Sequence, residues 1–392
     1  MDLRYSEADE RFRAELRSWL DSVLPTLPPP PPATDMRARR EYDCAWQRLM
    51  FDAGYAGIDW PKEHGGRGAS LTEQLVFLEE TERAHAPYVG MNFVGLLHAG
   101  PTLIAEATSE QRARHLPAIL KGSEVWCQGF SEPSAGSDLA SLRTRAVRDG
   151  DDYVVTGQKI WTSHAEVADF CELLVRTDPD APKHRGISWL IMPMDSPGIE
   201  TRPLETMYGT TEFSEMFLDE VRIPVANRVG DENDGWRVAM VTFSFERGTA
   251  FVSEMLRSME LLEDLAALAR KNGRWHDAGI RRELGHLAAD LDALWAMTKR
   301  NISHAARTGV PGVGGSLFKL YYSEVRHRMG DLALRVLDRA SLSFEDVGGL
   351  PTGEHVAGWA HAISITIAAG TSQIQRNIVA ERILGLPKDR QQ

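Results

Sequence analysis

The order of hydrophobic and polar residues divides the chain into three stretches of different periodicity. Near the N-terminus, Phe12, Leu16 and Leu20 lie at helical spacing on one face. Further helical patterns cover 36–54, 71–86 and 90–106. Together these patterns predict a helical domain over residues 1–124.

Local signals mark where these helices begin and end. Ser6 with Asp9, and Thr108 with Gln111, match the capping-box pattern, in which a hydroxyl precedes an acidic or amide side chain by three residues. The prolines at 28–32 end the first helix because proline has no amide hydrogen to donate. Such a run is either a recognition motif for another protein or a stiff connector, and we favour the connector.

The middle of the chain has the composition of strands. Runs of β-branched and apolar residues, bounded by Gly, Pro and Asp, occupy 153–156, 158–162, 187–192 and 216–223. They predict an all-β domain over residues 125–232.

Helical periodicity returns after residue 235. Long periodic stretches with short loops between them cover 236–270, 276–308, 314–340 and 355–384. They predict an antiparallel four-helix bundle within residues 233–392. The expected fold class is therefore α+β and multidomain, with an N-terminal helical domain, a middle β-barrel-like domain and a C-terminal four-helix bundle.

The composition argues against several classes of partner and site. The chain carries 44 Lys and Arg against 56 Asp and Glu, a net charge of −12 with no long basic run, which argues against nucleic acid as a partner. Three scattered cysteines suit neither a disulfide framework nor a zinc site, and the 12 histidines show no metal-ligand spacing. No apolar run approaches the ~18 residues of a membrane span. We expect a soluble, cytoplasmic protein without a metal and without membrane insertion.

Two short segments of the middle domain have residue types that suit a ligand site. Residues 130–138 read FSEPSAGSD, and glycine with small hydroxyl residues lets backbone amides approach an anionic or carbonyl-rich ligand. Trp161 is followed by Thr162 and Ser163, which suits a planar heteroaromatic ring that needs stacking and hydrogen bonds at its edge. Taken separately, such segments are more often an ordinary turn and a strand core.

Together with two further motifs, these segments resemble the acyl-CoA dehydrogenase family. Residues 370–377 read GTSQIQRN, and residues 57–66 read GIDWPKEHGG. The four motifs occur in the family's order and spacing, and the resemblance runs from about Leu3 to about Pro387. It implies the same three-domain fold as the periodicity.

The resemblance also implies a cofactor, a reaction and partners. Members of this family bind FAD non-covalently between the β domain and the bundle, and a neighbouring subunit completes the site. They remove two hydrogens from an acyl-CoA thioester to give the trans-2-enoyl-CoA, and they pass the electrons to an electron-transfer flavoprotein. We therefore expect a homo- or hetero-oligomer, a dimer or a tetramer.

Motif matching assigns cofactor contacts to particular residues. The flavin and its pyrophosphate would be lined by Phe130, Ser131, Gly136 and Ser137. Trp161 would pack on the isoalloxazine ring, with Thr162 beside it and Ser163 near its N5 edge. Thr371 and Gln373 would contribute from the C-terminal side.

The chain departs from the family pattern in two places. Many members carry a Gln-x-x-Gly-Gly-x-Gly stretch that reaches the partner's FAD, but residues 339–344 here read RASLSF, so that contact is not carried over. Members also place an arginine against the FAD diphosphate. Arg270 and Arg281 are both candidates for it, and either is also typical of a solvated helix face.

The most informative difference from the family pattern is the position of the catalytic base. Many members keep a glutamate directly before the Gly-Thr of the tail, where this chain has Ala369. A minority place it on the first bundle helix before an arginine, and here Glu246 precedes Arg247. A surface Glu–Arg pair is the alternative, but adjacent helical residues do not face each other, and the flanking Phe243 and Phe245 indicate burial. We expect Glu246 to be the general base.

Small residues replace large ones around the expected acyl group. Ala368 and Ala369 stand where the family often has a tyrosine and a glutamate, which predicts a preference for bulky, branched or ring-bearing acyl groups. The alternative is that the backbone closes in and the cavity stays narrow. The Ala369 amide remains available as an oxyanion donor. Gly370, Ser137 and Arg247 are the other expected substrate contacts.

Two other functions are compatible with the same fold. A flavin monooxygenase or oxidase generally lacks a placed carboxylate, so Glu246 argues against it. A non-catalytic or co-catalytic subunit of a hetero-oligomeric acyl-CoA dehydrogenase is favoured by the altered stretch around Ser341 and opposed by an intact Glu246.

Overall fold

The computed structural model describes residues 4–246, 252–308 and 314–388. Its N-terminal part is helical, as predicted, and both capping boxes are formed. Its α-helices are α1 (Glu7–Val23), α2 (Met36–Asp52), α3 (Leu71–Arg83), α4 (Gly100–Glu106) and α5 (Ser109–Leu120). The predicted helix over 90–106 forms, but its hydrogen-bonding pattern changes along its length. It consists of a 3-10 turn at Gly90–Asn92, a π-helical segment at Val94–Ala99 and then α4.

The middle part is one eight-stranded mixed sheet. Its strands are β1 (Trp126–Gly129), β2 (Arg145–Asp149), β3 (Asp152–Ser163), β4 (Phe170–Arg176), β5 (Ile187–Pro193), β6 (Ile199–Leu204), β7 (Phe213–Pro224) and β8 (Arg228–Val229). The order is β6-β7-β3-β2-β4-β5-β8, and β1 pairs with β4 in parallel. Alternation along β3 buries Tyr153 and Val155 on the core face, as expected for a strand covered on one side.

The C-terminal part has more helices than the sequence predicted. They are α6 (Gly235–Glu246), α7 (Val252–Lys271), α8 (Ala278–Thr308), α9 (Gly314–Leu337), α10 (Thr352–Ile365) and α11 (Ser372–Ile378). The predicted helix over 236–270 is described as α6 up to Glu246 and as α7 from Val252, and the prediction for residues 247–251 between them lies outside the described residues. The predicted helix over 355–384 is interrupted because Ala369 and Gly370 adopt positive φ angles, which a right-handed helix excludes.

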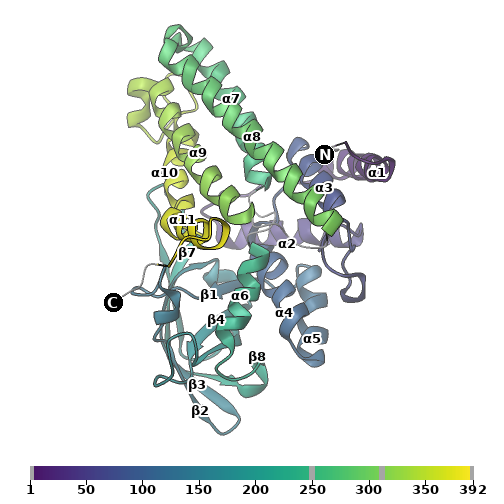
Figure 1. Cartoon of the computed structure of the whole chain (residues 1–392), viewed down its shortest axis with the longest axis vertical. Helices are drawn as coiled ribbons and strands as arrows, with labels where there is room; N and C mark the ends of the chain where they lie inside the picture. The colour runs from purple at the N-terminus through teal and green to yellow at the C-terminus, as the bar shows by residue number, and fades with distance from the viewer. Residues whose placement is uncertain (1–3, 247–251, 309–313, 389–392) are drawn as a thin grey trace.

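The two halves of the predicted 236–270 helix belong to different cores. Val238 and Ala239 of α6 are buried with the N-terminal helices and part of the sheet, whereas the bundle core begins at Met255 of α7. The antiparallel bundle consists of α7, α8, α9 and α10. It stands above the sheet domain in Figure 1, and the N-terminal helices lie beside the junction. The predicted boundary at 232/233 therefore falls just before a helix that packs outside the bundle.

Candidate functional site

The loop after β1 is held by a buried carboxylate. Glu132 Oε2 accepts a hydrogen bond from Arg143 N (2.7 Å), and its Oε1 accepts from Thr144 N (2.8 Å) and Lys159 Nζ (2.9 Å). Lys159 is fully buried and also donates to Phe130 O at 3.1 Å. Burial alone would raise the pKa of Glu132, but the Lys159 ammonium and the bonds from Thr144 and Arg143 lower it below its usual value. The loop is therefore fixed by a charged network before any ligand arrives.

The outer part of this loop faces solvent. Gly136 and Ser137 are exposed, and a Cβ at Gly136 would meet no atom within 4 Å. Phe130 is buried, and Ser131 O accepts a hydrogen bond from Ile160 N (3.0 Å). That bond brings the first predicted segment against the second.

A bulge in β3 presents Trp161. The pairing of β3 with β7 shifts register between Lys159 and Thr162, and Trp161 has a φ of 62°, which is rare and strained for a bulky residue. The indole is 58% exposed and meets Phe213 edge-on at a ring-centroid distance of 6.1 Å. The second segment therefore does not behave as ordinary strand core, since its large apolar ring is displayed on the surface.

Buried polar atoms without a partner follow the bulge. Within the described residues, Thr162 Oγ1, His164 Nδ1 and Glu212 Oε2 are buried and have no hydrogen-bond partner. His164 N donates to Glu212 O (2.7 Å), and Glu212 Oε1 accepts from the Tyr208 hydroxyl (2.7 Å). Burial lowers the pKa of His164 to about 4, so the imidazole is neutral at physiological pH. Such atoms ordinarily bind a ligand or an ordered water, so they identify this wall of the site as incomplete.

The end of α6 approaches the same loop. Phe243 meets Phe130 edge-on at a centroid distance of 5.8 Å, and Thr242 shares a buried hydrogen bond with Thr102 of α4 (2.9 Å). Glu246 is the last residue of this helix, three positions after Phe243. Its side chain and Arg247 lie outside what the structure describes, so both assignments stay predictions.

The turn between α10 and α11 is clamped from two helices. Ala369 and Gly370 have φ angles of 53° and 89°. Lys319 of α9, which is buried, donates to Gly370 O (2.7 Å), and buried Gln375 donates to Ala369 O (2.8 Å). Among the described residues, the backbone N–H groups of Ala369 and Gly370 have no acceptor. The turn therefore holds two adjacent amides available for a ligand oxygen.

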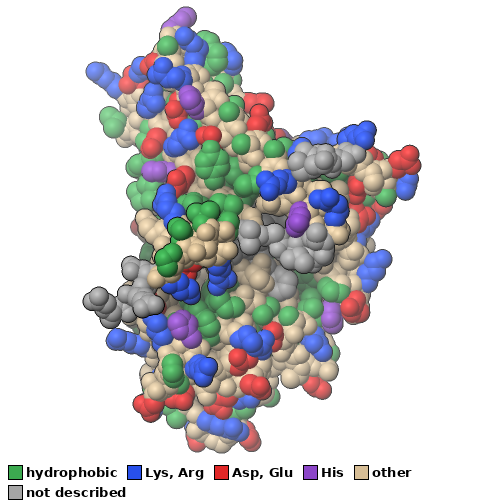
Figure 2. Space-filling view, in the orientation of Figure 1, with side chains coloured by type: hydrophobic (Ala, Val, Ile, Leu, Met, Phe, Trp, Pro, Cys, Tyr) green, Lys and Arg blue, Asp and Glu red, His purple; other side chains and the backbone are tan. Residues whose placement is uncertain are grey.

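The other predicted tail residues border this turn. Thr371 caps α11 by accepting from Ile374 N (3.2 Å), while Ala368 and Gln373 are exposed. Ile367 nearby is 60% exposed. Figure 2 shows hydrophobic side chains gathered on this face, where the end of the bundle meets the sheet domain.

A ring contact joins the bundle to the sheet domain. His361 of α10 meets Tyr208 edge-on at 5.4 Å, on the loop that continues through Glu212 to Phe213 and hence to Trp161. The structure thus brings together the loop 130–138, the segment 161–164, the end of α6 and α10, although they are far apart in the sequence (Figure 1).

The two candidate arginines are not part of this cluster. Arg270 stacks over Trp275 at 4.0 Å from the ring centroid, and Arg281 donates to Trp275 O (2.5 Å). Both lie near the connection between α7 and α8, at the top of the bundle in Figure 1 and away from the sheet domain. Any role of either arginine at a diphosphate therefore needs a second subunit, and it stays a prediction.

Several supporting residues were not predicted from the sequence. Lys159, Lys319, Gln375 and Tyr208 were not singled out. Lys159 had a signal, because strand alternation places it in phase with Tyr153 and Val155 on the core face. Lys319 and Gln375 had none, because their contacts with the turn depend on how α9 and α11 pack.

The described residues contain neither a membrane-spanning helix nor a metal-binding cluster. In the ranges 4–246, 252–308 and 314–388, no helix combines the length and apolar character needed to cross a bilayer. The same residues contain no group of three or more His, Cys, Asp or Glu side chains that could hold a metal ion.

Family models match all three parts of the chain. The acyl-CoA dehydrogenase N-terminal, middle and C-terminal domain models match residues 6–123, 127–221 and 233–384. The chain is also 38% identical over 387 residues to acyl-CoA dehydrogenase IpdE1 of Mycobacterium tuberculosis, an alignment that covers 97% of this chain and 98% of that protein.

Two solved structures are also similar to this chain in both fold and sequence. The Tcur3481-Tcur3483 steroid ACAD superposes with a TM-score of 0.85 at 34% identity, covering 99% of this chain and 100% of that one. The ChsE4-ChsE5 complex from Mycobacterium tuberculosis gives a TM-score of 0.80 at 34% identity, with 99% and 100% covered. The predicted three-part fold is confirmed.

Proposed function

The chain belongs to the acyl-CoA dehydrogenase family and is an enzyme of it, and from that premise we propose that it binds FAD and converts a bulky acyl-CoA to the trans-2-enoyl-CoA. The observation that carries the proposal is the pair of left-handed turns, at Trp161 and at Ala369–Gly370, on the two sides of the junction. One displays an aromatic face and the other displays two free amides, which are the groups that a flavin and a thioester carbonyl need.

The described residues fit a flavin. The exposed Trp161 indole offers a planar apolar face, and the buried Thr162 hydroxyl is a polar group that the described chain leaves without a partner. Gly136 and Ser137 leave open space for a phosphate-bearing segment. Phe130, Ser131, Ser163, Thr371 and Gln373 are further proposed contacts. When bound, FAD supplies the acceptor for the hydride that leaves Cβ of the thioester.

The chain's own residues supply the rest of the chemistry. The Glu246 carboxylate accepts the proton from Cα, while the amide of Ala369 donates a hydrogen bond to the thioester oxygen as it gains negative charge. Lys319 and Gln375 hold the turn that carries that amide, through the two carbonyls that follow it in the chain. Electrons then leave to an electron-transfer flavoprotein, as the family resemblance implies.

A second subunit is part of the proposal. Leu342 and Phe344 are 89% and 57% exposed at the end of the bundle where the family's partner contact lies. The similar solved structures include two that are named as pairs of proteins. We therefore propose an oligomer, with a hetero-oligomer as the first arrangement to test.

The experiment is a panel of thioesters with an artificial electron acceptor, after the FAD content per subunit has been measured. The expected result is about one FAD per active site and a kcat/KM that is higher for a ring-bearing acyl-CoA than for butyryl-CoA. Absence of oxidation with every thioester, in a protein that retains FAD, would favour the non-catalytic subunit. Rapid reaction of the reduced enzyme with oxygen would favour the oxidase.

A further inference from the structure

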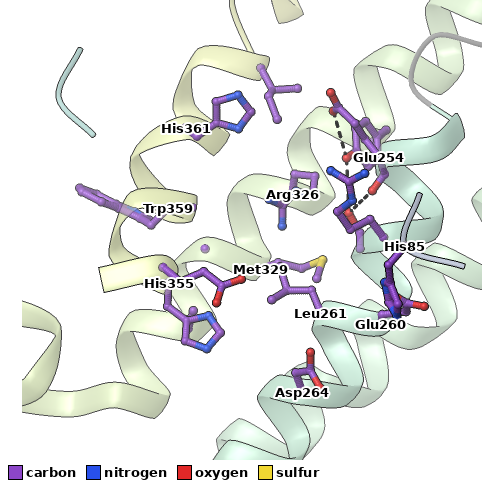
Figure 3. A pocket seen from close by; sticks show the side chains of 18 residues that line it. His85, Glu254, Glu260, Leu261, Asp264, Arg326, Met329, His355, Trp359 and His361 are labelled. Atoms are coloured by element: carbon purple, nitrogen blue, oxygen red, sulfur yellow. Dashed lines mark hydrogen bonds and ion pairs between the residues drawn. The ribbon is translucent and has the colours of Figure 1, made fainter. Parts of the chain in front are cut away.

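A partly open cavity of about 410 Å³ lies within the bundle, between α7, α9 and α10 (Figure 3). Leu261, Met329 and Ile365 give it an apolar portion. A cavity of this size is far larger than a packing defect, since protein interiors rarely leave voids larger than a water molecule. Its volume is within the range of small-molecule sites.

The remaining lining is polar and partly buried. The Tyr322 hydroxyl lies 3.4 Å from Glu254 Oε2 and 3.3 Å from Ser258 Oγ. Figure 3 shows the Arg326 side chain in the middle of the cavity, between Glu254 and His361. In the part of the chain that the structure describes, Arg326 forms no hydrogen bond or ion pair, whereas Arg257 beside it is paired with Glu82 at 3.0 Å.

These groups restrict the chemistry of an occupant. A purely aliphatic group would displace water from Arg326 and give it no acceptor, which is costly for a cation. A carboxylate would approach Glu254, Glu260, Asp264 and Glu354, which all line the cavity. An uncharged oxygen avoids both costs, because it accepts a hydrogen bond from the guanidinium without adding negative charge.

The cavity lies near residues that the proposed reaction uses. His361, on its wall, contacts Tyr208 of the sheet-domain loop that leads to Trp161. α10 runs from the cavity wall at Ile365 toward the Ala369 turn, four positions later in the chain. The cavity is thus next to the place where the thioester would react, on the side away from the sheet domain.

We infer that this cavity binds the far end of the acyl group and selects one that carries a hydroxyl or ketone oxygen, which accepts a hydrogen bond from Arg326. The inference rests on the proposed function, because it assigns a binding site to the end of the acyl group that lies far from the thioester.

Binding is measured with thioethers that cannot be dehydrogenated. Calorimetry on the FAD-loaded protein compares S-dodecyl-CoA with S-(12-hydroxydodecyl)-CoA, and the expected Kd is about fivefold lower for the hydroxylated ligand. A third ligand, carrying a terminal carboxylate, should bind more weakly than the hydroxylated one. Equal affinity of the first two, tighter binding of the carboxylate, or no binding of any of them would overturn the inference.

Two variants test the place of binding. Gly358 lines the cavity, and a Cβ there meets no atom within 4 Å, so Gly358→Leu fills space without a backbone clash. It should raise the Kd of the hydroxylated thioether at least tenfold. Gly285→Leu is the matched control, since Gly285 is exposed on α8 and a Cβ there also meets nothing within 4 Å. An equal effect of both substitutions would show that the ligand lies elsewhere.

The role of Arg326 is tested by the ratio of two Kd values, that of S-dodecyl-CoA and that of S-(12-hydroxydodecyl)-CoA. Arg326→Met should reduce the fivefold preference for the hydroxylated thioether to about one, and Arg326→Lys, which retains a donor, should keep part of it. A preference that survives Arg326→Met would contradict the assignment. These binding results are independent of turnover, so a protein that oxidises no thioester but keeps the preference would reject the proposed reaction and not the cavity.

Discussion

Two buried lysines support the two walls of the proposed site in different ways. Lys159, below the sheet-domain loop, donates to Phe130 O and is also paired with Glu132 at 2.9 Å. Lys319, below the α10–α11 turn, donates to a backbone carbonyl, Gly370 O. Removing either charge of the Lys159–Glu132 pair would leave the other buried and unpaired, which is costly, so this pair holds the sheet-domain loop firmly. The Ala369–Gly370 turn is held through its backbone carbonyls instead.

The largest effect is expected at the end of α6. Glu246→Gln is nearly isosteric and should retain the fold and bound FAD, while turnover falls by about 10²–10⁴-fold because the general base is lost. Steady-state kinetics with the best thioester of the panel, together with the flavin absorption spectrum, measure both. Near-normal turnover would mean that the base lies elsewhere.

The comparison of the two lysines is tested by matched substitutions. Lys159→Met should lower the free energy of unfolding by about 3–5 kcal/mol, because it leaves Glu132 buried without its counter-charge. Lys319→Met should cost about 1–3 kcal/mol, since it removes the hydrogen bond to Gly370 O. Lys183→Met is the control, because its ion pair with Asp138 is exposed and worth about 0–1 kcal/mol. Denaturant titration gives the order, and equal costs for Lys159 and Lys319 would remove the distinction between the walls.

The pH dependence of stability tests the sheet-domain wall. Burial lowers the pKa of His164 from 6.5 to about 4, so the unfolded chain binds a proton that the folded chain does not between these values. Stability is therefore lost as the pH falls from 6.5 toward 4, by at most about 2 kcal/mol between pH 7 and pH 5. His164→Asn, which tolerates the φ of 58°, should reduce that loss.

The smallest effect is expected from replacing the exposed indole of Trp161. Trp161→Ala should weaken FAD binding about two- to tenfold, through loss of aromatic packing worth about 0.5–1.5 kcal/mol. The measurements are the FAD content after gel filtration and the positions of the flavin absorption bands. Unchanged values would show that Trp161 is displayed for another ligand.

Much of the fold could be predicted from local patterns. Helical and strand periodicities separated the three parts, and the capping boxes at Ser6 and Thr108 formed as expected. Periodicity did not reveal that α6 and α7, which belong to one predicted helical pattern, are buried in two different cores. A hydrophobic face specifies burial but does not specify the element that covers it.

The sequence by itself determined which residues have the chemistry for the site, and the tertiary structure decided which of them meet. Motif matching singled out Trp161, Ala369 and Gly370, but the periodicity predicted a strand through the first and a helix through the other two, so only the structure revealed their positive φ angles. The clamp by Lys319, the contact of Tyr208 with His361 and the cavity around Arg326 join elements from distant parts of the chain. Such contacts depend on how helices and sheet pack against one another, which no local periodicity encodes.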